Sequence, residues 1–228
     1  MSKINMKPAY QKFDAFSTYI VNSVKKEKVI NPLQFSNELR NIGDIFVSNG
    51  QKEIMNKKSK WLAETLVSMK NLKLAGRIYS YLIKLNKGNN KMIEEFAQNG
   101  LIIAKRLSDP VHIMARANDL KEIYKYTKPG SEAHLKVLFD EKRALTDIVR
   151  NYDNAKKRNV AIARDLKPIE AYEEKLAAVK IEIAEAFLNS GKNIFDAKNE
   201  LKEALKIYEK IGEGPNCDKI RNLLKKLS

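Results

Sequence analysis

The sequence has few of the residues that interrupt helices or cross-link a chain. Its 228 residues include nine glycines, six prolines and one cysteine, Cys217. A single cysteine excludes an intramolecular disulfide framework and favours a reducing compartment. The first residues, MSKINMKPAYQKF, contain no apolar stretch of signal-peptide length, and no run in the chain approaches the roughly 18 apolar residues that a membrane helix needs. We therefore expect a soluble, cytoplasmic protein that does not insert into membranes.

Arginine is also scarce. The 43 basic and 28 acidic residues give a net charge of +15, but 34 of the basic residues are lysines and only nine are arginines. A positive charge favours an acidic partner, whereas a dedicated nucleic-acid binder is expected to use more arginine, which contacts phosphate bidentately. The 21 asparagines and 22 isoleucines match what an AT-rich coding sequence imposes on a surface, so codon bias remains an alternative. Residues 1–114 carry 19 basic and 9 acidic residues, and residues 115–228 carry 24 and 19.

Helix start and stop signals divide the chain into about ten segments, and the pattern is all-helical. Asn31 before Pro32 and Asp109 before Pro110 each combine a capping side chain with a proline at the first helical position. Gly50 tolerates the left-handed conformation of a helix end. The expected helices cover about 8–27, 31–48, 51–69, 72–85, 91–107, 110–126, 131–152, 169–189, 193–211 and 216–227. Whether the seventh continues to about residue 166 is left open.

One phrase occurs twice in the chain. The stretches LRNIGDIFVSNGQ (39–51) and IEIAEAFLNSGKN (181–193) each contain an aliphatic residue followed by a small one, an aromatic three positions later and a glycine four positions after that. Weaker copies lie around Gly76 and Lys121. A second phrase, at 97–104 and 197–204, places two alanines and an aliphatic residue on one helical face. The chain therefore contains degenerate repeats of a helical unit.

The two phrases together resemble the tetratricopeptide repeat, a helical hairpin of about 34 residues. Residues 181–211 carry every core position, with one extra residue in the turn, and the units at 35–69, 72–107 and 110–152 match in part. In the first unit the alanine positions are occupied by Met55, Ser59 and Leu62. The resemblance implies that the small residue admits the second helix and that the aromatic fills the gap to the next repeat.

The implied fold class is all-α: a right-handed array of antiparallel helix hairpins, or tetratricopeptide-like α-solenoid, of about ten helices. Ten helices with short connections suit stacked hairpins better than a four-helix bundle. We expect a single domain over 1–228. Its parts are an N-terminal helix (8–27), two hairpins (31–107), a third, irregular hairpin with a long helix (110–166), and a C-terminal hairpin with a capping helix (169–227).

No catalytic or metal-binding set assembles in the sequence. His112 and His134 belong to no Glu-x-x-His or His-x-x-x-His pattern, and Cys217 has no histidine near it in sequence. Adjacent carboxylates such as Glu94 and Glu95 point in different directions on a helix, and no glycine-rich phosphate loop is present. We therefore expect no enzyme, no cofactor and no metal ion. The single tryptophan, Trp61, is expected in the core.

The resemblance also implies a concave groove lined by the first helix of each hairpin, which holds an extended peptide or a partner helix. Register from the repeated phrase assigns to this groove Asn37, Arg40 and Asp44 in the first unit, Lys70, Lys73, Arg77 and Tyr81 in the second, and Asn118, Glu122 and Lys125 in the third. The predicted partner-binding residues are Asn37, Arg40, Lys73, Arg77, Tyr81, Asn118 and Lys125. Lysine and asparagine at such positions clamp a terminal carboxylate in some members of the family.

The leading hypothesis is a protein–protein interaction module that binds an acidic protein segment in a basic groove. The alternative is a nucleic-acid or anionic-surface binder that uses lysine-rich helix faces, such as NKKSK at 56–60 and KKR at 156–158. A purely structural subunit is a third reading, because alternating charges in KNELKEALKIYEK support an exposed helix. The sequence does not specify the oligomeric state.

Overall fold

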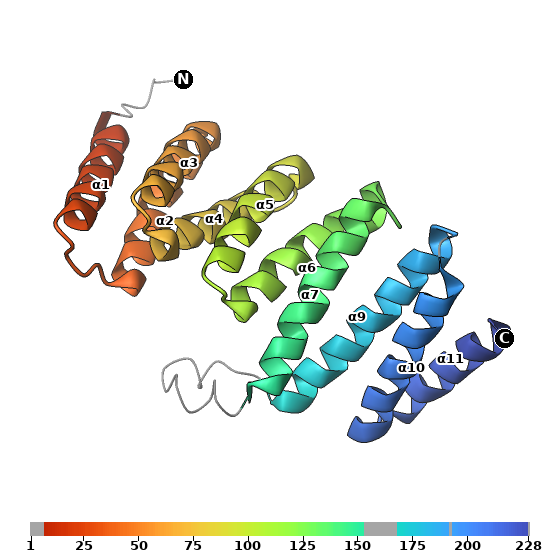
Figure 1. The fold of residues 1–228 in the computed structure, drawn as a ribbon. Helices are drawn as coiled ribbons and strands as arrows, with labels where there is room; N and C mark the ends of the chain where they lie inside the picture. Colours follow the sequence, from red (N-terminus) through yellow and green to blue (C-terminus); the bar gives the residue numbers. More distant parts are fainter. Residues whose placement is uncertain (1–6, 153–167, 192, 228) are drawn as a thin grey trace. The chain divides into compact units, whose positions relative to one another are not determined.

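The computed structural model describes residues 7–152, 168–191 and 193–227, and every regular element among them is an α-helix (Figure 1). The predicted all-α class is confirmed, with ten helices in this part of the chain. In chain order they are α1 (Lys7–Lys25), α2 (Pro32–Ser48), α3 (Lys52–Ser68), α4 (Leu72–Leu85), α5 (Asn90–Arg106), α6 (Pro110–Thr127), α7 (Glu132–Arg150), α9 (Ile169–Asn189), α10 (Ile194–Ile211) and α11 (Gly214–Lys226). The continuation of the seventh predicted helix over 153–166 lies outside the described residues.

Helices begin at the polar residues that the sequence marks as caps. The side-chain oxygen of Asn31 accepts hydrogen bonds from the backbone N–H groups two and three residues further on, at 2.9 and 3.1 Å, and Pro32 occupies the first helical position. Asp109 and Ser131 accept in the same way from the N–H groups three residues on, at 3.1 and 3.2 Å. These side chains satisfy first-turn donors that have no partner inside a helix.

Glycine ends two helices where the sequence predicts it. Gly50 follows α2 and Gly191 follows α9, with φ angles of 69° and 65°. The N–H after Gly50 reaches back to the carbonyl oxygen of Phe46 at 2.8 Å. This bond gives the carbonyl of Phe46 a partner that the helix itself does not supply. It requires a residue in the left-handed conformation just before the donor, and Gly50 is that residue.

The helices form two compact units, unit 1 (Met1–Leu107) and unit 2 (Ser108–Ser228). Within each unit, helices that follow one another along the chain pack together, as in a helical repeat array. The division falls between the expected second and third hairpins. The single domain over 1–228 stays a prediction.

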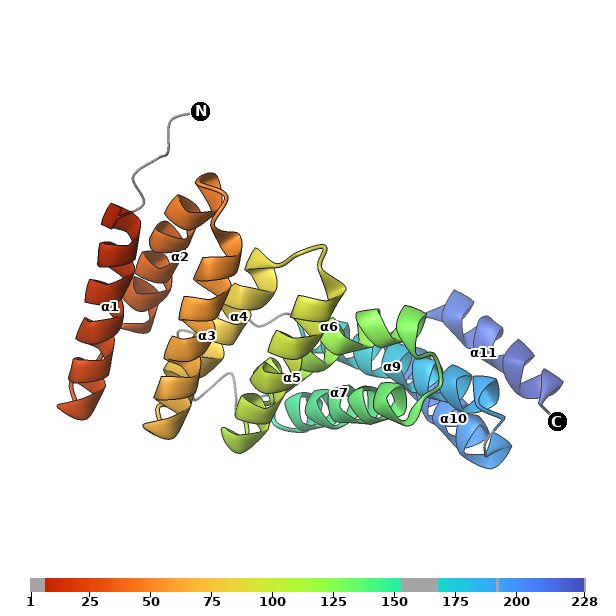
Figure 2. The same ribbon diagram turned by 90° about the horizontal axis from the view of Figure 1, so that it is seen from above.

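Unit 1 consists of two rows of helices. Figures 1 and 2 show α1, α3 and α5 side by side in one row and α2 and α4 in the other. Ion pairs connect the helices of the first row. The ammonium group of Lys58 on α3 lies 2.6 Å from a carboxylate oxygen of Asp14 on α1, and that of Lys60 lies 2.6 Å from a carboxylate oxygen of Glu95 on α5. In the second row, α2 and α4 contact each other directly. The rows alternate along the chain, which is the arrangement of stacked hairpins.

Both copies of the repeated phrase place the same positions inside. The residues of the aliphatic–small pairs are all buried: Ile42, Gly43, Ile183 and Ala184. Phe46 is fully buried and packs edge-on against Tyr10 of α1, with ring centroids 5.3 Å apart. Phe187 is partly buried and lies 6.1 Å from the ring of Phe139 on α7. In both copies this ring contact is with the preceding described helix, whereas the resemblance implied the following repeat.

The alanine phrases also face inward. Their residues are buried in α5 and α10: Ala97, Leu101, Ala104, Ala197, Leu201 and Ala204. The larger residues at these positions in α3 are buried as well, since Met55, Ser59 and Leu62 have no exposed surface. The weak match of the first unit therefore does not prevent α3 from packing against α4.

The prediction that Trp61 belongs to the core is wrong. Its side chain is 54% exposed, while Leu62 and Ala63 beside it are fully buried. The inward stripe of α3 passes through Ser59, Leu62 and Leu66, at helical spacing. Trp61 lies one residue, or about 100°, away from Leu62 on the helix, and its size alone does not bring it inside.

Candidate functional site

The candidate site is the face formed by α2 and α4 in unit 1. On α2, Asn37 and Arg40 are three residues apart, and on α4, Lys73 and Arg77 are four apart, so each pair lies on one side of its helix. All four side chains are exposed. The guanidinium of Arg77 donates to the hydroxyl of Ser36 on α2, at 3.4 Å, which joins the two helices. We call these four residues and Ser36 the α2/α4 face.

The cationic groups of the α2/α4 face have no ion-pair partner among the described residues. The described ion pairs of unit 1 involve Lys58 and Lys60 and leave out Arg40, Lys73 and Arg77. Their positive charge is therefore not neutralised within the described structure. Asp44, one turn after Arg40 on α2, is the nearby carboxylate on the same side of the helix.

Tyr81, the remaining predicted groove residue of α4, is only partly exposed. Its hydroxyl group is buried, has no hydrogen-bond partner among the described residues, and lies against Gly43 of α2. Burial, with a smaller contribution from the charge of Asp44, raises the pKa of the Tyr81 phenol far above its ordinary value of 10.0. The hydroxyl cannot meet a docked peptide, because it fills the contact between α2 and α4.

The two remaining predicted residues lie on α6 in unit 2. Asn118 is partly buried, and Lys125 is exposed, with its ammonium group 5.9 Å from the centroid of the Tyr126 ring. Lys121 lies between them on the same side of α6 and is buried. Asn118 and Lys125 belong to unit 2, whereas Asn37, Arg40, Lys73 and Arg77 belong to unit 1. The candidate site is therefore limited to the α2/α4 face of unit 1.

Sequence reasoning missed a network of buried charges in unit 2. Glu141 of α7 has no exposed surface. Its carboxylate oxygens lie 3.1 Å from the ammonium group of Lys121 on α6 and 3.2 Å from that of Lys175 on α9. Lys121 also lies 3.0 Å from Glu182 of α9. Both oxygens of Glu141 lack a well-aligned hydrogen bond, so these are contacts between charges. Burial lowers the pKa of Lys121, but the two carboxylates outweigh this effect and raise the pKa above 10.5.

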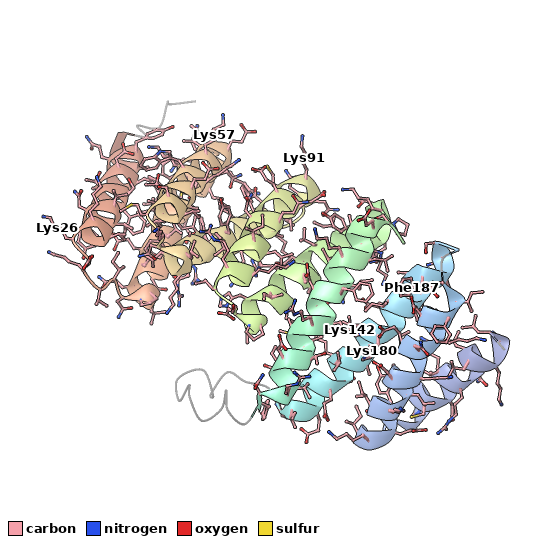
Figure 3. The ribbon with its side chains drawn as sticks, in the orientation of Figure 1. Lys26, Lys57, Lys91, Lys142, Lys180 and Phe187 are labelled. Carbon is pink, nitrogen blue, oxygen red and sulfur yellow. The ribbon has the colours of Figure 1, made fainter. Side chains whose placement is uncertain are left out.

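A second group of charges connects α7, α9 and α10. Figure 3 labels Lys142 on α7 and Lys180 on α9, and both ammonium groups pair with Glu200 of α10. Lys180 also pairs with Glu203, which lowers the pKa of that carboxyl chiefly through their hydrogen bond. The sequence signal was available, because Glu141 and Lys180 occupy positions that helical periodicity assigns to the inward stripe. The ion pairs of Glu200 thus connect α10 to both α7 and α9.

The lysine-rich stretch 56–60 is largely engaged within unit 1. Asn56 is buried and exchanges amide hydrogen bonds of 3.0 and 2.8 Å with Asn86 at the end of α4. Lys58 and Lys60 form the ion pairs between rows described above, and Lys57 is the exposed lysine of the stretch (Figure 3). The stretch 156–158 lies outside the described residues.

The described residues contain no group of three or more histidine, cysteine or acidic side chains that is able to hold a metal ion. His112 lies 2.8 Å from the carboxylate of Asp109, and the Nδ1 atom of His134 accepts a hydrogen bond from the N–H of Gly130 at 3.2 Å. Cys217 is buried in a hydrophobic cluster that includes Tyr208. Among the described helices, none has the length and apolar character needed to cross a membrane.

No family model matches the chain, and no curated protein matches it. Among solved structures, the crystal structure of BtubC (BKLC) from P. vanneervenii is similar in a distant way, with 12% identity and a TM-score of 0.33. The match covers 90% of this chain and 92% of that one. A likeness at this level gives no information about function.

Proposed function

We propose that this protein is a non-enzymatic, cytoplasmic adaptor of the tetratricopeptide-like type, which docks an acidic protein segment on the α2/α4 face. The observation that carries the proposal is the set of three exposed cationic side chains, Arg40, Lys73 and Arg77, which have no ion pair among the described residues. They lie on two neighbouring helices of one row. A carboxylate of a bound segment accepts charge-assisted hydrogen bonds from such groups.

The distribution of charge supports unit 1 as the binding unit. Residues 1–107 carry 19 basic and 8 acidic residues, whereas residues 108–228 carry 24 and 20. In unit 2 many of these charges pair with one another, as in the networks around Glu141 and Glu200. The excess positive charge of unit 1 attracts an acidic partner and raises the association rate.

The alternative, binding of nucleic acid or an anionic surface through lysine-rich faces, is less well supported. Two of the three lysines in 56–60 meet carboxylates inside unit 1, and their charge is partly cancelled there. A phosphate backbone would have to compete with these ion pairs. Binding of this kind also predicts a steep loss of affinity with salt.

Charge reversal tests the proposal. The variant carries Arg40→Glu, Lys73→Glu and Arg77→Glu, and the control carries Lys57→Glu, Lys87→Glu and Lys91→Glu, which are exposed residues of the same unit. Both change the net charge equally. The probe is a fluorescein-labelled 14-residue peptide rich in glutamate, compared with the same peptide carrying glutamine, and fluorescence anisotropy reports binding.

We expect the α2/α4 variant to bind the acidic peptide at least about tenfold more weakly, or about 1.4 kcal/mol, and the control to stay within about threefold. Equal weakening in both variants would sink the assignment to this face. Partner lists from cells expressing the wild type and the α2/α4 variant provide a second readout, and identical lists contradict the proposal. A single-stranded RNA that binds more tightly than the peptide, with a steep salt dependence, would favour the alternative.

A further inference from the structure

A hollow of about 620 Å³ lies along α1 and α2 in unit 1. Its floor is formed by the buried side chains Phe16, Ile20, Phe35 and Ile42. Its wall includes two apolar residues that are open to solvent: Tyr19 is 64% exposed and Val29 is 99% exposed. We call this hollow the α1/α2 groove. Apolar side chains gathered over an open groove are typical of a docking site.

The α1/α2 groove lies on the side of α2 that faces away from α4. Besides the floor residues Phe35 and Ile42, the residues of α2 that line it are Gln34, Glu38, Asn41 and Ile45. The residues of α2 that contact α4 include Ser36, which bonds to Arg77, and Gly43, which lies against Tyr81. At about 100° per residue these two sets lie on opposite sides of the helix. The groove therefore continues the row of α2 and α4 by one position.

The row pattern of unit 1 indicates what shape fits this position. α2 contacts α3 in the other row and α4 in its own row. A helix in the α1/α2 groove would contact α1 in the other row and α2 in its own row. It would thus relate to α1 and α2 as α2 relates to α3 and α4. Among the described residues of unit 1 this place is open, while the corresponding places beside α3 and α5 are taken by α2 and α4 (Figures 1 and 2).

The dimensions and charges of the groove define the chemistry of its occupant. A second hollow of about 330 Å³ shares Ala15 and Tyr19 with the first and extends to Lys26 and Lys28. The lining of the two hollows thus follows α1 from Lys12 to its end, a length of about 20 Å or nearly four helical turns. Three lysines stand at the rim, beside one carboxylate, Glu38. An apolar floor with a basic rim complements a helix that is apolar on one side and acidic on the other.

We propose that the α1/α2 groove binds an amphipathic helix of a partner protein. The apolar side of this helix covers Tyr19 and Val29, and its acidic side faces Lys12, Lys26 and Lys28. The site is distinct from the α2/α4 face, and the proposal does not rest on the function argued for that face. The helix completes the second row of unit 1.

The test uses an 18-residue synthetic peptide with leucines at i, i+3, i+4 and i+7 and glutamates at the remaining positions. Its controls are a peptide of the same composition in scrambled order and one with lysine in place of glutamate. The methyl-labelled 228-residue chain is titrated with the peptide in an NMR experiment. We expect the methyl signals of Ala15, Val29 and Ile45 to shift, and that of Ile102, an exposed residue on α5, to stay unchanged.

Matched variants separate the groove from general hydrophobic binding. Tyr19→Glu together with Val29→Glu is expected to weaken binding at least tenfold, and Ile102→Glu, a change at another apolar residue that is 57% exposed, to leave it within twofold. The Arg40→Glu, Lys73→Glu, Arg77→Glu variant is expected to bind the helix within threefold of the wild type. Failure of the α2/α4 face and failure of the groove are therefore distinguishable.

Three outcomes overturn the proposal. The first is equal binding of the scrambled peptide or of the lysine peptide, since neither matches the groove in both periodicity and charge. The second is a set of shifted methyl groups outside the lining. The third is a concentration-dependent dimer in sedimentation that Val29→Glu dissociates, which would make a second copy of this chain the occupant.

Discussion

The phenolic oxygen of Tyr81 on α4 occupies the space into which a side chain on Gly43 of α2 would project. A Cβ atom added to Gly43 would lie 1.7 Å from this oxygen and 2.8 Å from Cζ of the same ring. The nearest atom of α3, the methyl group of Met55, would be 3.4 Å away. The small residue of the first repeated phrase thus admits the neighbouring helix of its own row. The resemblance had implied that it admits the second helix of its hairpin.

Replacing this glycine is expected to destabilise unit 1. Alanine gains about 1 kcal/mol of helix propensity, but the overlap forces the Tyr81 ring to move, and overpacking of this kind costs about 1–3 kcal/mol. We expect Gly43→Ala to lower the free energy of unfolding, as measured by urea denaturation followed by circular dichroism. At Gly76, the matching position on α4, an added Cβ meets Ile103 at an ordinary 3.5 Å, so Gly76→Ala is expected to be neutral or stabilising by up to about 1 kcal/mol.

The Tyr81 hydroxyl offers an internal control for that prediction. Since this buried group has no hydrogen-bond partner, Tyr81→Phe removes a desolvated polar atom and is expected to be neutral or slightly stabilising. In the Gly43→Ala background the same change removes the closest overlap and leaves the one at Cζ, so it recovers part of the lost stability. A loss of stability at Gly76 equal to that at Gly43 contradicts this account.

The elements of this fold follow from local chemistry that the sequence displays. Asn31 with Pro32 predicts the start of α2, and Gly50 predicts its end, because capping and left-handed turns depend on neighbouring residues alone. The pairing of Lys121 with Glu141 was not predictable in the same way, since each needs a charge from another helix. Trp61 was misplaced because size and hydrophobicity do not specify which side of a helix faces inward.

The candidate site shows the same limit. Repeat register places Arg40 and Arg77 on exposed helix faces, and both side chains are exposed in the structure. Register predicts exposure well because it depends only on the periodicity along one helix. Register did not reveal that Tyr81 is held against Gly43, since this contact joins two helices whose spacing depends on both. The α1/α2 groove also required the structure, because it arises from the placement of two rows.

Glu141 gives a prediction about the buried charges of unit 2. Glu141→Gln removes the charge that Lys121 and Lys175 share, and removing one partner of a buried pair costs about 3 kcal/mol. Lys121 keeps Glu182, so the loss is expected at or below that value. Urea denaturation followed by circular dichroism measures it. The exposed pair Lys58–Asp14 is the control, and Asp14→Asn is expected to cost less than about 1 kcal/mol.

A double substitution tests whether the cost at Glu141 comes from the unpaired charges. Glu141→Leu alone leaves Lys121 beside an apolar group with Glu182 as its remaining partner, whereas Glu141→Leu with Lys121→Met replaces the pair by apolar side chains of similar size. Buried ion pairs are often replaceable in this way without loss of stability. The double variant is therefore expected to be more stable than Glu141→Leu. Additive losses from the two substitutions would argue against coupling between these residues.

His134 is expected to make the stability of unit 2 depend on pH. Burial, followed by the charges of Lys121 and Lys125, lowers the pKa of the ring below 6.5, and the neutral Nδ1 accepts the N–H of Gly130. As the pH falls below 6.5, the unfolded chain takes up a proton before the folded one does. Stability is therefore lost as the pH falls from 6.5 toward the lowered pKa, by at most about 1.4 kcal/mol per pH unit.

His134→Asn removes the titrating ring and retains an acceptor near the same place. Urea denaturation of both proteins between pH 7.5 and 5 measures the effect, and the variant is expected to show the smaller pH dependence. Asp109 acts in a separate range, because the hydrogen bond from His112 lowers its pKa below 3.8 and its contribution is lost only in stronger acid. An equal slope in the two proteins over this range would exclude His134 as its source.

Gly50 and Lys70 follow α2 and α3 at the same position of the same turn. Their φ angles are 69° and 61°, and the N–H after each bonds to a carbonyl five residues back, at 2.8 Å in both cases. Only Lys70 has a Cβ, which the left-handed conformation disfavours by about 1 kcal/mol. We expect Lys70→Gly to raise the free energy of unfolding by about that amount and Gly50→Ala to lower it similarly, in urea denaturation. An added Cβ at Gly50 has no atom within 4 Å, so a loss there reports backbone conformation rather than a steric clash. Opposite signs at the two positions are required, because the turn is the same and only the residue differs.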